Sequence, residues 1–110
     1  MAIEIPVPYK SANKIFTVTI DNAIYRFRLR WNNRSETWTL TILDKSEAVL
    51  LAGIAVVMNF DLLAPWRRSI PSLPRGSLLC IRSDGDDATP GRYDLGVGRL
   101  ARLVYEPATI

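Results

Sequence analysis

The side chains most often used in acid-base and nucleophilic catalysis are scarce in this sequence. It contains no histidine and one cysteine, Cys80, which excludes catalytic pairs of the Ser-His and Cys-His kind. A single cysteine forms no internal disulfide and leaves no ligand set for a zinc site. Because Cys80 lies in the apolar run LLCI, we expect it to be a small buried hydrophobe, with a reactive thiol as the alternative.

Carboxylates are the remaining candidates for chemistry. Asp84, Asp86 and Asp87 in SDGDD form the one dense acidic cluster, and their spacing is that of the start of a calcium loop. The rest of that pattern and its closing glutamate are missing. We therefore expect a solvated loop, with weak metal binding or a metal-dependent hydrolase as the alternative. The G-x-G of Gly96 and Gly98 follows no strand of a dinucleotide-binding unit and indicates a turn. We predict a protein that is not an enzyme, with no catalytic, cofactor-binding or metal-binding residues.

Arginines are the residues that could carry binding. In YRFRLRW, Arg26, Arg28 and Arg30 alternate with apolar residues, so they project from one face of a strand. The aromatic residues fall on the opposite face, which disfavours base stacking on an arginine platform. The net charge of +3 is only a mild bias toward polyanions. We expect a solvent-facing or protein-facing surface, with nucleic-acid contact as the alternative.

Two hairpins position this arginine row. If Trp31 pairs with Trp38, every apolar side chain of the segments 25–31 and 38–42 falls on one face, and a slip of one residue would expose both tryptophans. The turn residues before Ala23, Asp21-Asn22, tolerate positive φ and suit a tight hairpin. Closing that turn places the apolar residues of segment 14–20 on the same face, so the two turns agree on which side is buried.

The other segments also favour strands. Residues 3–7 alternate as an edge strand, in which Pro6 and Pro8 remove hydrogen-bond donors. The run 48–58, AVLLAGIAVVM, fits a buried helix or a strand. Its β-branched residues favour the strand, and Gly53 suits a bulge. Further strands are expected at 77–82 and 99–105, and a short helical turn near 59–64, capped by Asn59 or Asp61.

The predicted fold is all-β. Residues 1–110 would form one domain, a small barrel or sandwich of about six to seven mostly antiparallel strands. No apolar run approaches the roughly 20 residues needed to span a bilayer, and the N-terminus lacks the features of a signal peptide. We therefore expect the protein to be made in the cytoplasm and to have no association with a membrane.

Irregular and edge segments carry more apolar residues than loops normally need. Such residues often contact a partner; the alternative is that the loop folds back over an open end of a barrel. Ile3 and Ile5 belong to this apolar set, and Arg75 could lie near the basic residues. The candidate partner-contact residues, apolar and basic, are Arg26, Arg28, Arg30, Leu62, Leu63, Trp66, Arg67, Arg68, Ile70 and Leu73.

The order of these features resembles the baseplate plug family of contractile-tailed phages. The resemblance rests on YRFRLRW, WTLTILD, GIAVVMNFDLL, the SDGDDATP loop leading to DLG, and a closing LVY. It extends from about Phe16 to Tyr105, and the segment from Ala64 to Gly76 matches least well. The positions that match are Trp31, Trp38, Asp44, Gly53, Asp61, Leu62, Leu63, Asp84, Asp86, Leu95 and Gly96, and we interpret them as determinants of the fold.

The resemblance implies a structural virion protein of the tail baseplate, made in the host cytoplasm. It would act as a plug where the tail tube meets the central hub and spike, and it would contact hub, tail-tube or tape-measure proteins. Several copies would be present in the symmetric tail. No cofactor and no catalytic residue follow from the family. The alternative function is a small β-barrel that binds nucleic acid through the arginine face.

Overall fold

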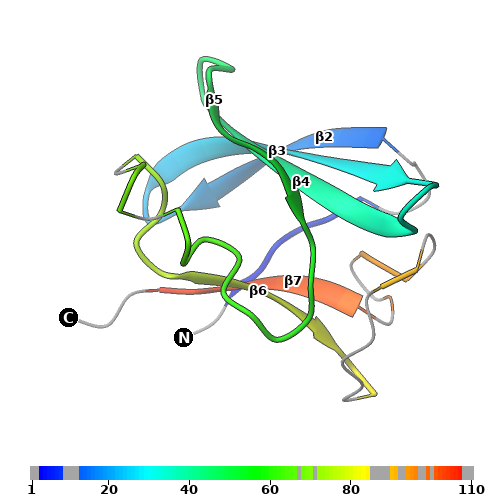
Figure 1. The fold of residues 1–110 in the computed structure, drawn as a ribbon. Helices are drawn as coiled ribbons and strands as arrows, with labels where there is room; N and C mark the ends of the chain where they lie inside the picture. Colours follow the sequence, from blue (N-terminus) through cyan, green and yellow to red (C-terminus); the bar gives the residue numbers. More distant parts are fainter. Residues whose placement is uncertain are drawn as a thin grey trace.

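Seven β-strands make up the described part of the protein. The computed structural model describes residues 3–8, 13–66, 68–70, 72–84, 90–91, 94–96, 99 and 101–107. The strands are β1 (Ile3–Glu4), β2 (Asn13–Ile20), β3 (Ala23–Asn32), β4 (Thr37–Asp44), β5 (Val49–Ala55), β6 (Ser77–Arg82) and β7 (Ala101–Glu106). They form two antiparallel sheets with the strand orders β2-β3-β4-β5 and β1-β7-β6. The sheets lie face to face as two layers (Figure 1). The predicted all-β class is confirmed, and of the two predicted architectures the fold is the sandwich.

Both predicted hairpin registers are confirmed. Trp31 lies opposite Trp38 in the pairing of β3 with β4. The turn between β2 and β3 consists of Asp21 and Asn22, whose φ angles are 53° and 64°. Two consecutive residues with positive φ are the signature of a type I′ turn, whose twist matches that of the flanking strands. The Asp21-Asn22 turn and the turn between Trp31 and Trp38 fix the registers of the two hairpins. The apolar side chains of three strands therefore share one face.

Most of the ambiguous run 48–58 forms a strand, as predicted, although the strand covers only Val49–Ala55. β5 pairs with β4, and the register shifts between Leu40 and Ile42. Gly53 lies in this irregularity with a φ of 63°, and its amide donates to Thr41 Oγ1 at 3.0 Å. An extra residue on one strand of an antiparallel pair forms a bulge. The bulge predicted at Gly53 is therefore present.

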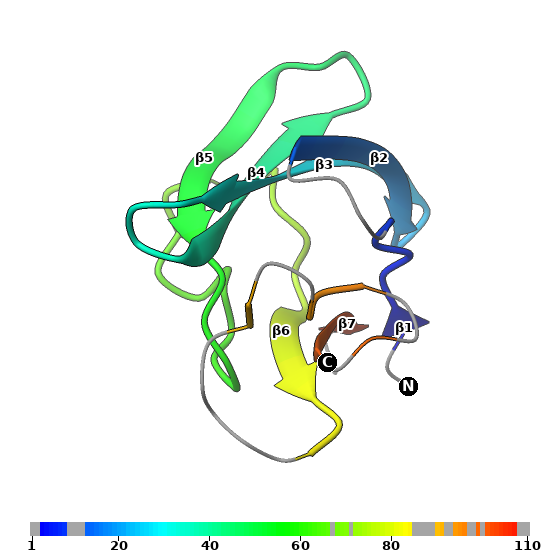
Figure 2. The same cartoon turned by 90° about the vertical axis from the view of Figure 1, so that its right-hand side faces the viewer.

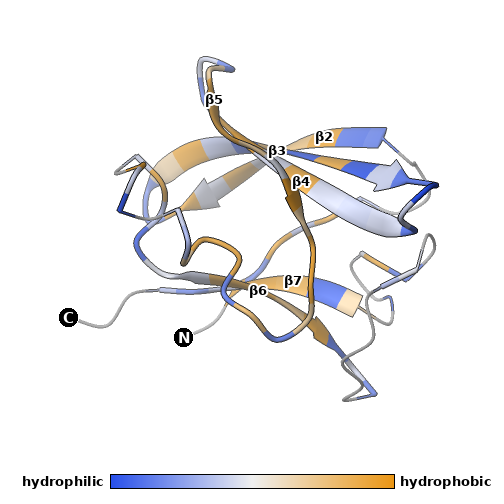
Figure 3. Ribbon diagram, viewed as in Figure 1, coloured by the Kyte–Doolittle hydropathy of each residue, from blue (hydrophilic) through white to orange (hydrophobic). Residues whose placement is uncertain are grey.

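The core lies between the two sheets. Hydrophobic and hydrophilic residues alternate along much of β2 and β3 (Figure 3), and most of the apolar ones point toward the other layer; Ile15 and Ile24 are exposed. Phe27 and Trp38 from the first sheet and Tyr105 from the second are fully buried. Trp31 packs edge-on against Trp38, with ring centroids 5.6 Å apart, a favourable aromatic geometry. Aromatic side chains from both layers thus make up much of the core.

Residues 56–76 connect the two sheets. After β5 the chain descends to the other layer (Figure 1), where Met58 bridges Cys80 of β6. The predicted helical turn near 59–64 is a series of hydrogen-bonded turns, and no helix occurs among the described residues. Ala64 N–H donates to Asp61 O, and Trp66 N–H donates to Leu63 O. These bonds do not continue into a regular ladder, since Pro65 has no amide proton to donate.

The three-stranded sheet joins the two ends of the chain. β1 pairs with β7 over two residues, and the two strands lie side by side (Figure 2). β1 is an edge strand, as predicted, but Ile5 and Val7 beyond it are buried while Ile3 is exposed. The closing strand begins at Ala101, two residues later than predicted. No helix long and apolar enough to cross a membrane occurs in the described ranges.

Candidate functional site

The arginine row lies on the outer face of the four-stranded sheet. Arg26, Arg28 and Arg30 alternate in β3 with Phe27 and Leu29, which are fully buried. Because successive side chains of a strand point to opposite faces, the arginines point away from the core. Arg26 and Arg28 are half-buried among their neighbours, and Arg30 is exposed. The other sheet lies on the far side of this layer (Figure 1), so the row faces outward.

Threonines flank the row on both neighbouring strands. Thr17 of β2 lies opposite Arg26, and Thr41 of β4 lies opposite Arg28. Threonine side chains are short and polar, and they leave the longer arginine side chains standing above the sheet. The outer face is therefore basic, with threonine hydroxyl groups on one side of each of these arginines and the apolar residues Ile15 and Leu43 on the other.

The arginines of this face are only partly satisfied within the chain. Arg26 Nη1 lies 3.2 Å from Glu47 Oε1, with both side chains partly exposed, and such surface ion pairs contribute little stability. The Nε atoms of Arg26 and Arg28 are buried and have no hydrogen-bond acceptor in the described structure. A buried donor without an acceptor is unfavourable. The buried Nε atoms are closed to a partner, so a partner carboxylate would bind these half-buried side chains through their terminal guanidinium nitrogens.

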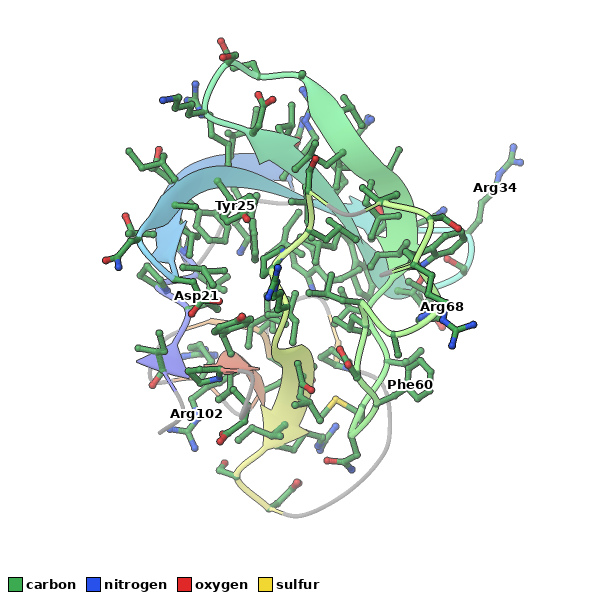
Figure 4. All side chains as sticks on the ribbon, turned by 90° about the vertical axis from the view of Figure 1, so that its left-hand side faces the viewer. Asp21, Tyr25, Arg34, Phe60, Arg68 and Arg102 are labelled. Atoms are coloured by element: carbon green, nitrogen blue, oxygen red, sulfur yellow. The ribbon has the colours of Figure 1, made fainter. Side chains whose placement is uncertain are left out.

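A hollow of about 400 Å³ extends the row at the end of the β3–β4 hairpin. Its lining is polar and basic and consists of Arg30, Trp31, Asn32, Asn33, Arg34 and Thr39. Asn32 Oδ1 accepts from the amide of Arg34 at 2.9 Å, which shapes the turn, and the Arg34 side chain projects into solvent (Figure 4). Arg34 was missed as a site residue because it lies in the loop, outside the alternating pattern. We call Arg26, Arg28, Arg30 and Arg34 the arginine surface.

The second predicted contact region is largely buried. Leu62, Leu63 and Leu73 are 3%, 0% and 4% exposed, so the prediction that they contact a partner at the surface is wrong for the folded chain. Ile5, which belonged to the same apolar set, is also buried. The alternative in which the loop folds back over the core is the one that the structure shows for these residues.

Asp61 explains this burial. Its Oδ1 accepts from the amides of Leu63 and Leu78, both at 3.1 Å. The amide of Leu62 donates to the carbonyl of Leu78 at 2.8 Å. These bonds fasten the segment along the outer edge of β6, so that its two leucines fall into the space between the sheets. The sequence analysis predicted Asp61 as a cap of a helical turn. It did not predict the bond of Asp61 to the amide of Leu78 in β6.

Other members of the region remain accessible. Trp66 is 40% exposed and Phe60 is 49% exposed; Arg68 is exposed and Ile70 is half-buried. Phe60 and Arg68 lie on the same side of the molecule, opposite Asp21 (Figure 4). Arg67 lies outside the described residues. The sequence analysis missed Phe60, whose signal is a large aromatic between the polar residues Asn59 and Asp61.

An apolar groove of about 420 Å³ lies between β5 and this segment. Its lining is almost entirely hydrophobic: Ala52, Gly53, Ile54, Ala55, Val57, Phe60, Leu62, Pro65 and Trp66. We call it the aromatic groove. Exposed aromatics beside a groove are typical of protein contact sites, because they bury a large apolar area on binding.

The acidic cluster is described only in part. Asp84 binds the guanidinium of Arg82 through both carboxylate oxygens, with nitrogen–oxygen distances of 3.1 and 2.9 Å. Asp86 and Asp87 lie outside the described residues, so the predicted solvated loop or weak metal site stays a prediction. Among the described residues, no three His, Cys, Asp or Glu side chains are placed to hold a metal ion.

Cys80 is fully buried, as predicted. Burial raises the pKa of its thiol to about 12, and the nearby Arg82 charge opposes this shift. The thiolate is the reactive form of cysteine. Cys80 therefore behaves as a core side chain.

A polar cluster joins the two sheets. The Tyr105 hydroxyl donates to Asp21 Oδ2 at 2.6 Å and accepts from the amide of Gly76 at 2.8 Å. Burial, followed by the hydrogen bond to Asp21, raises the pKa of Tyr105 to about 12. The Tyr25 hydroxyl donates nearby to Ser72 O at 3.2 Å. This cluster positions the turn of one sheet against a strand of the other.

One protein family matches nearly the whole chain. Its description is "Cyanophage baseplate Pam3 plug gp18", and the match covers residues 2–108. No curated protein matches the chain significantly. The family match confirms the resemblance to phage baseplate plugs that the order of sequence motifs indicated. With its two-layered β-fold and its outward-facing arginine and aromatic side chains, the chain belongs to the family of the cyanophage baseplate plug gp18 of Pam3.

Proposed function

We propose that this protein is a structural subunit of a contractile phage tail baseplate. It acts as a plug at the junction of the tail tube with the central hub and spike. The observation that carries this proposal is the match of residues 2–108 to a baseplate plug family. The protein works by packing against hub, tail-tube or tape-measure proteins, in several copies within the symmetric assembly of the virion.

The arginine surface is the first candidate contact. Arginine is enriched in protein interfaces because its planar guanidinium binds carboxylates in a fixed geometry. Arg28 and Arg30 project from a sheet face that carries no further layer. A partner with acidic side chains would supply acceptors to these donors.

The aromatic groove is the second candidate contact, with Phe60 and Trp66 as its large accessible side chains; Arg68, which is exposed, and Ile70, which is half-buried, follow in the same segment. Large exposed apolar side chains that lie together mark interaction sites more often than isolated ones. Phe60 and Trp66 line the same groove and come from a segment fastened to β6. The segment is therefore held in place before a partner binds.

Co-elution with purified hub and tail-tube proteins of the same phage tests this proposal. The double variant Arg28→Gln with Arg30→Gln should weaken binding to the partner about tenfold or more, since buried charge pairs in interfaces cost several kcal/mol to break. Lys45→Gln with Arg75→Gln, two exposed residues, removes the same charge elsewhere and should leave binding unchanged. Absence of co-elution with any baseplate protein would overturn the assignment as a plug.

The alternative of nucleic-acid binding is tested in the same preparation. Trp38 is fully buried, and Trp31, which packs on it, is half-buried and lines the hollow beside Arg30 and Arg34. One partly exposed ring offers little area for stacking successive bases. A plug should bind a single-stranded oligonucleotide weakly at any salt concentration. Affinity that is strong at low salt and falls steeply toward physiological salt would favour the nucleic-acid function.

A further inference from the structure

One long edge of the sandwich is unpaired. β2 pairs only with β3, and the eight paired positions between them run without a register shift. In a hairpin with a two-residue turn, the residues that flank the turn form a hydrogen-bonded pair, and such pairs alternate along the strands. Ile20 flanks the turn, so Val18 and Phe16 also bond to β3. The backbone amides and carbonyls of Ile15, Thr17 and Thr19 therefore point to the free edge.

This edge is open to solvent. Ile15, Thr17 and Thr19 are all exposed, and the described structure gives their outward backbone groups no hydrogen-bond partner. Unpaired N–H and C=O groups along an extended strand are a template for another strand.

The other three edges are protected. β1 is two residues long and is followed by Pro6 and Pro8. β5 is interrupted by register shifts and by Gly53 with a positive φ. The outer edge of β6 is covered by the segment from Met58 to Leu62. Between Ile15 and Ile20, β2 has no proline, bulge or charge of the kind that normally blocks strand addition.

The charges beside this edge select among possible occupants. Across the sheet, Thr17 lies next to Arg26 and Ile15 next to Arg28. A strand added to β2 would lie about 10 Å from β3, twice the spacing between neighbouring strands. One outward glutamate side chain could reach over the short Thr17 side chain to Arg26, whose ion pair with Glu47 is partly exposed, and another could reach past Ile15 to Arg28. A second copy would instead bring two arginine rows of like charge to the joint, and each chain already has a net charge of +3.

We propose that the free edge of β2 binds an extended acidic segment of another protein chain by antiparallel strand addition. The backbone of Ile15, Thr17 and Thr19 supplies the hydrogen bonds. Arg26 and Arg28 supply the preference for carboxylates at alternate positions of the added strand. This mode of recognition obtains affinity from the main chain and specificity from alternate side chains. It concerns a surface separate from the aromatic groove and does not rest on the function as a plug.

Amide hydrogen exchange of the ¹⁵N-labelled protein tests the proposal. The probe is a capped peptide of four Glu-Val repeats, which places all carboxylates on one face of a strand. At saturation it should slow exchange of the Ile15, Thr17 and Thr19 amides by about tenfold or more, because protection requires opening of the added pairing. Phe16 and Val18, which already bond to β3, should change little. Unchanged exchange at the three edge amides would overturn the proposal.

Matched peptides separate strand addition from simple charge attraction. A peptide of four Lys-Val repeats should not bind. A peptide of four glutamates followed by four valines has the same charge without the alternation and should bind at least about tenfold more weakly, a difference of ~1.4 kcal/mol. Equal protection by either control, or by an octadeoxynucleotide, would overturn the proposal. So would concentration-dependent dimerisation of the protein alone with protection of the same amides, which would identify a second copy as the occupant.

Variants separate the contribution of the backbone hydrogen bonds from that of the arginine side chains. Thr17→Pro removes an outward amide without breaking a bond to β3, and proline is tolerated on such edges; it should abolish binding of the Glu-Val peptide. Arg28→Gln should weaken binding, whereas Arg75→Gln removes the same charge from an exposed residue of the connection before β6 and should not. Equal weakening by Arg28→Gln and Arg75→Gln would show that net charge alone attracts the peptide and would overturn the selective role of the row.

Discussion

At the scale of single residues, the Tyr105 hydroxyl joins three distant parts of the chain. It bridges the buried amide of Gly76 and the carboxylate of Asp21, which is 84 positions away in the sequence. Tyr105→Phe keeps the ring but removes both hydrogen bonds of the hydroxyl, which should lower the free energy of unfolding by about 1–3 kcal/mol. Urea denaturation measures this loss. Tyr25→Phe, which removes the longer bond to Ser72 O, is the control and should cost less; an equal loss in both would contradict the bridging role.

The same hydroxyl makes stability sensitive to alkaline pH. The pKa of Tyr105 rises from its ordinary value of 10 to about 12 in the folded chain, through burial and then the bond to Asp21. A group whose pKa is raised on folding stabilises the folded state fully below its unfolded pKa, and this contribution is lost as pH rises through the folded pKa. The wild type should therefore lose more stability than Tyr105→Phe between pH 10 and 12. Urea denaturation at each pH measures this difference. If the free energies of unfolding of the two proteins fell in parallel over this pH range, the raised pKa of Tyr105 would be contradicted.

At the scale of elements, Gly53 sets the bulge that bends β5. Its φ is 63°, and a Cβ added to it would meet no atom within 4 Å. Gly53→Ala should therefore lower the free energy of unfolding by about 1 kcal/mol, because alanine disfavours the left-handed backbone conformation. No steric clash adds to this loss. Gly53→Asn should recover part of this loss, because asparagine tolerates that conformation better. Thermal denaturation of the three proteins measures the order, and an alanine variant as stable as the wild type would contradict the strained bulge.

The hairpins were predictable because their signals are local. Alternation and the turn residues Asp21 and Asn22 determine each register within about twenty residues of chain. The segment 59–73 carries no such periodicity, and its leucines could point outward or inward with equal local justification. Their burial depends on Asp61 reaching Leu78 in a strand that follows later in the sequence. Sequence analysis therefore identified the arginine row but misplaced the three leucines.

At the scale of the whole molecule, the choice of a sandwich depends on contacts between parts far apart in sequence. β1 and β7 come from opposite ends of the chain and pair in one sheet, while β2 to β5 form the other as a meander. No local pattern encodes which strands share a sheet, since the alternation of β2, β3 and β4 and the continuous apolar runs of β5 and β6 specify burial but not the neighbouring strand. The open edge of β2 follows only from this arrangement, and for that reason it could not be found in the sequence.

We propose that residues 1–110 fold as one domain whose two sheets unfold together, because they share one core. Phe27 in β3 is fully buried, and Phe27→Ala should lower the free energy of unfolding by about 3–5 kcal/mol through lost burial and a cavity. In a Trp66→Phe background, where Trp31 and Trp38 are the remaining tryptophans, fluorescence reports the hairpin, and amide exchange of Leu103 reports the other sheet. Both probes should shift together in urea. Ile15→Ala, at a position 43% exposed on the outer face, should change stability by less than about 0.5 kcal/mol. Retention of Leu103 protection after the fluorescence change would show instead that the sheets are separate cooperative units.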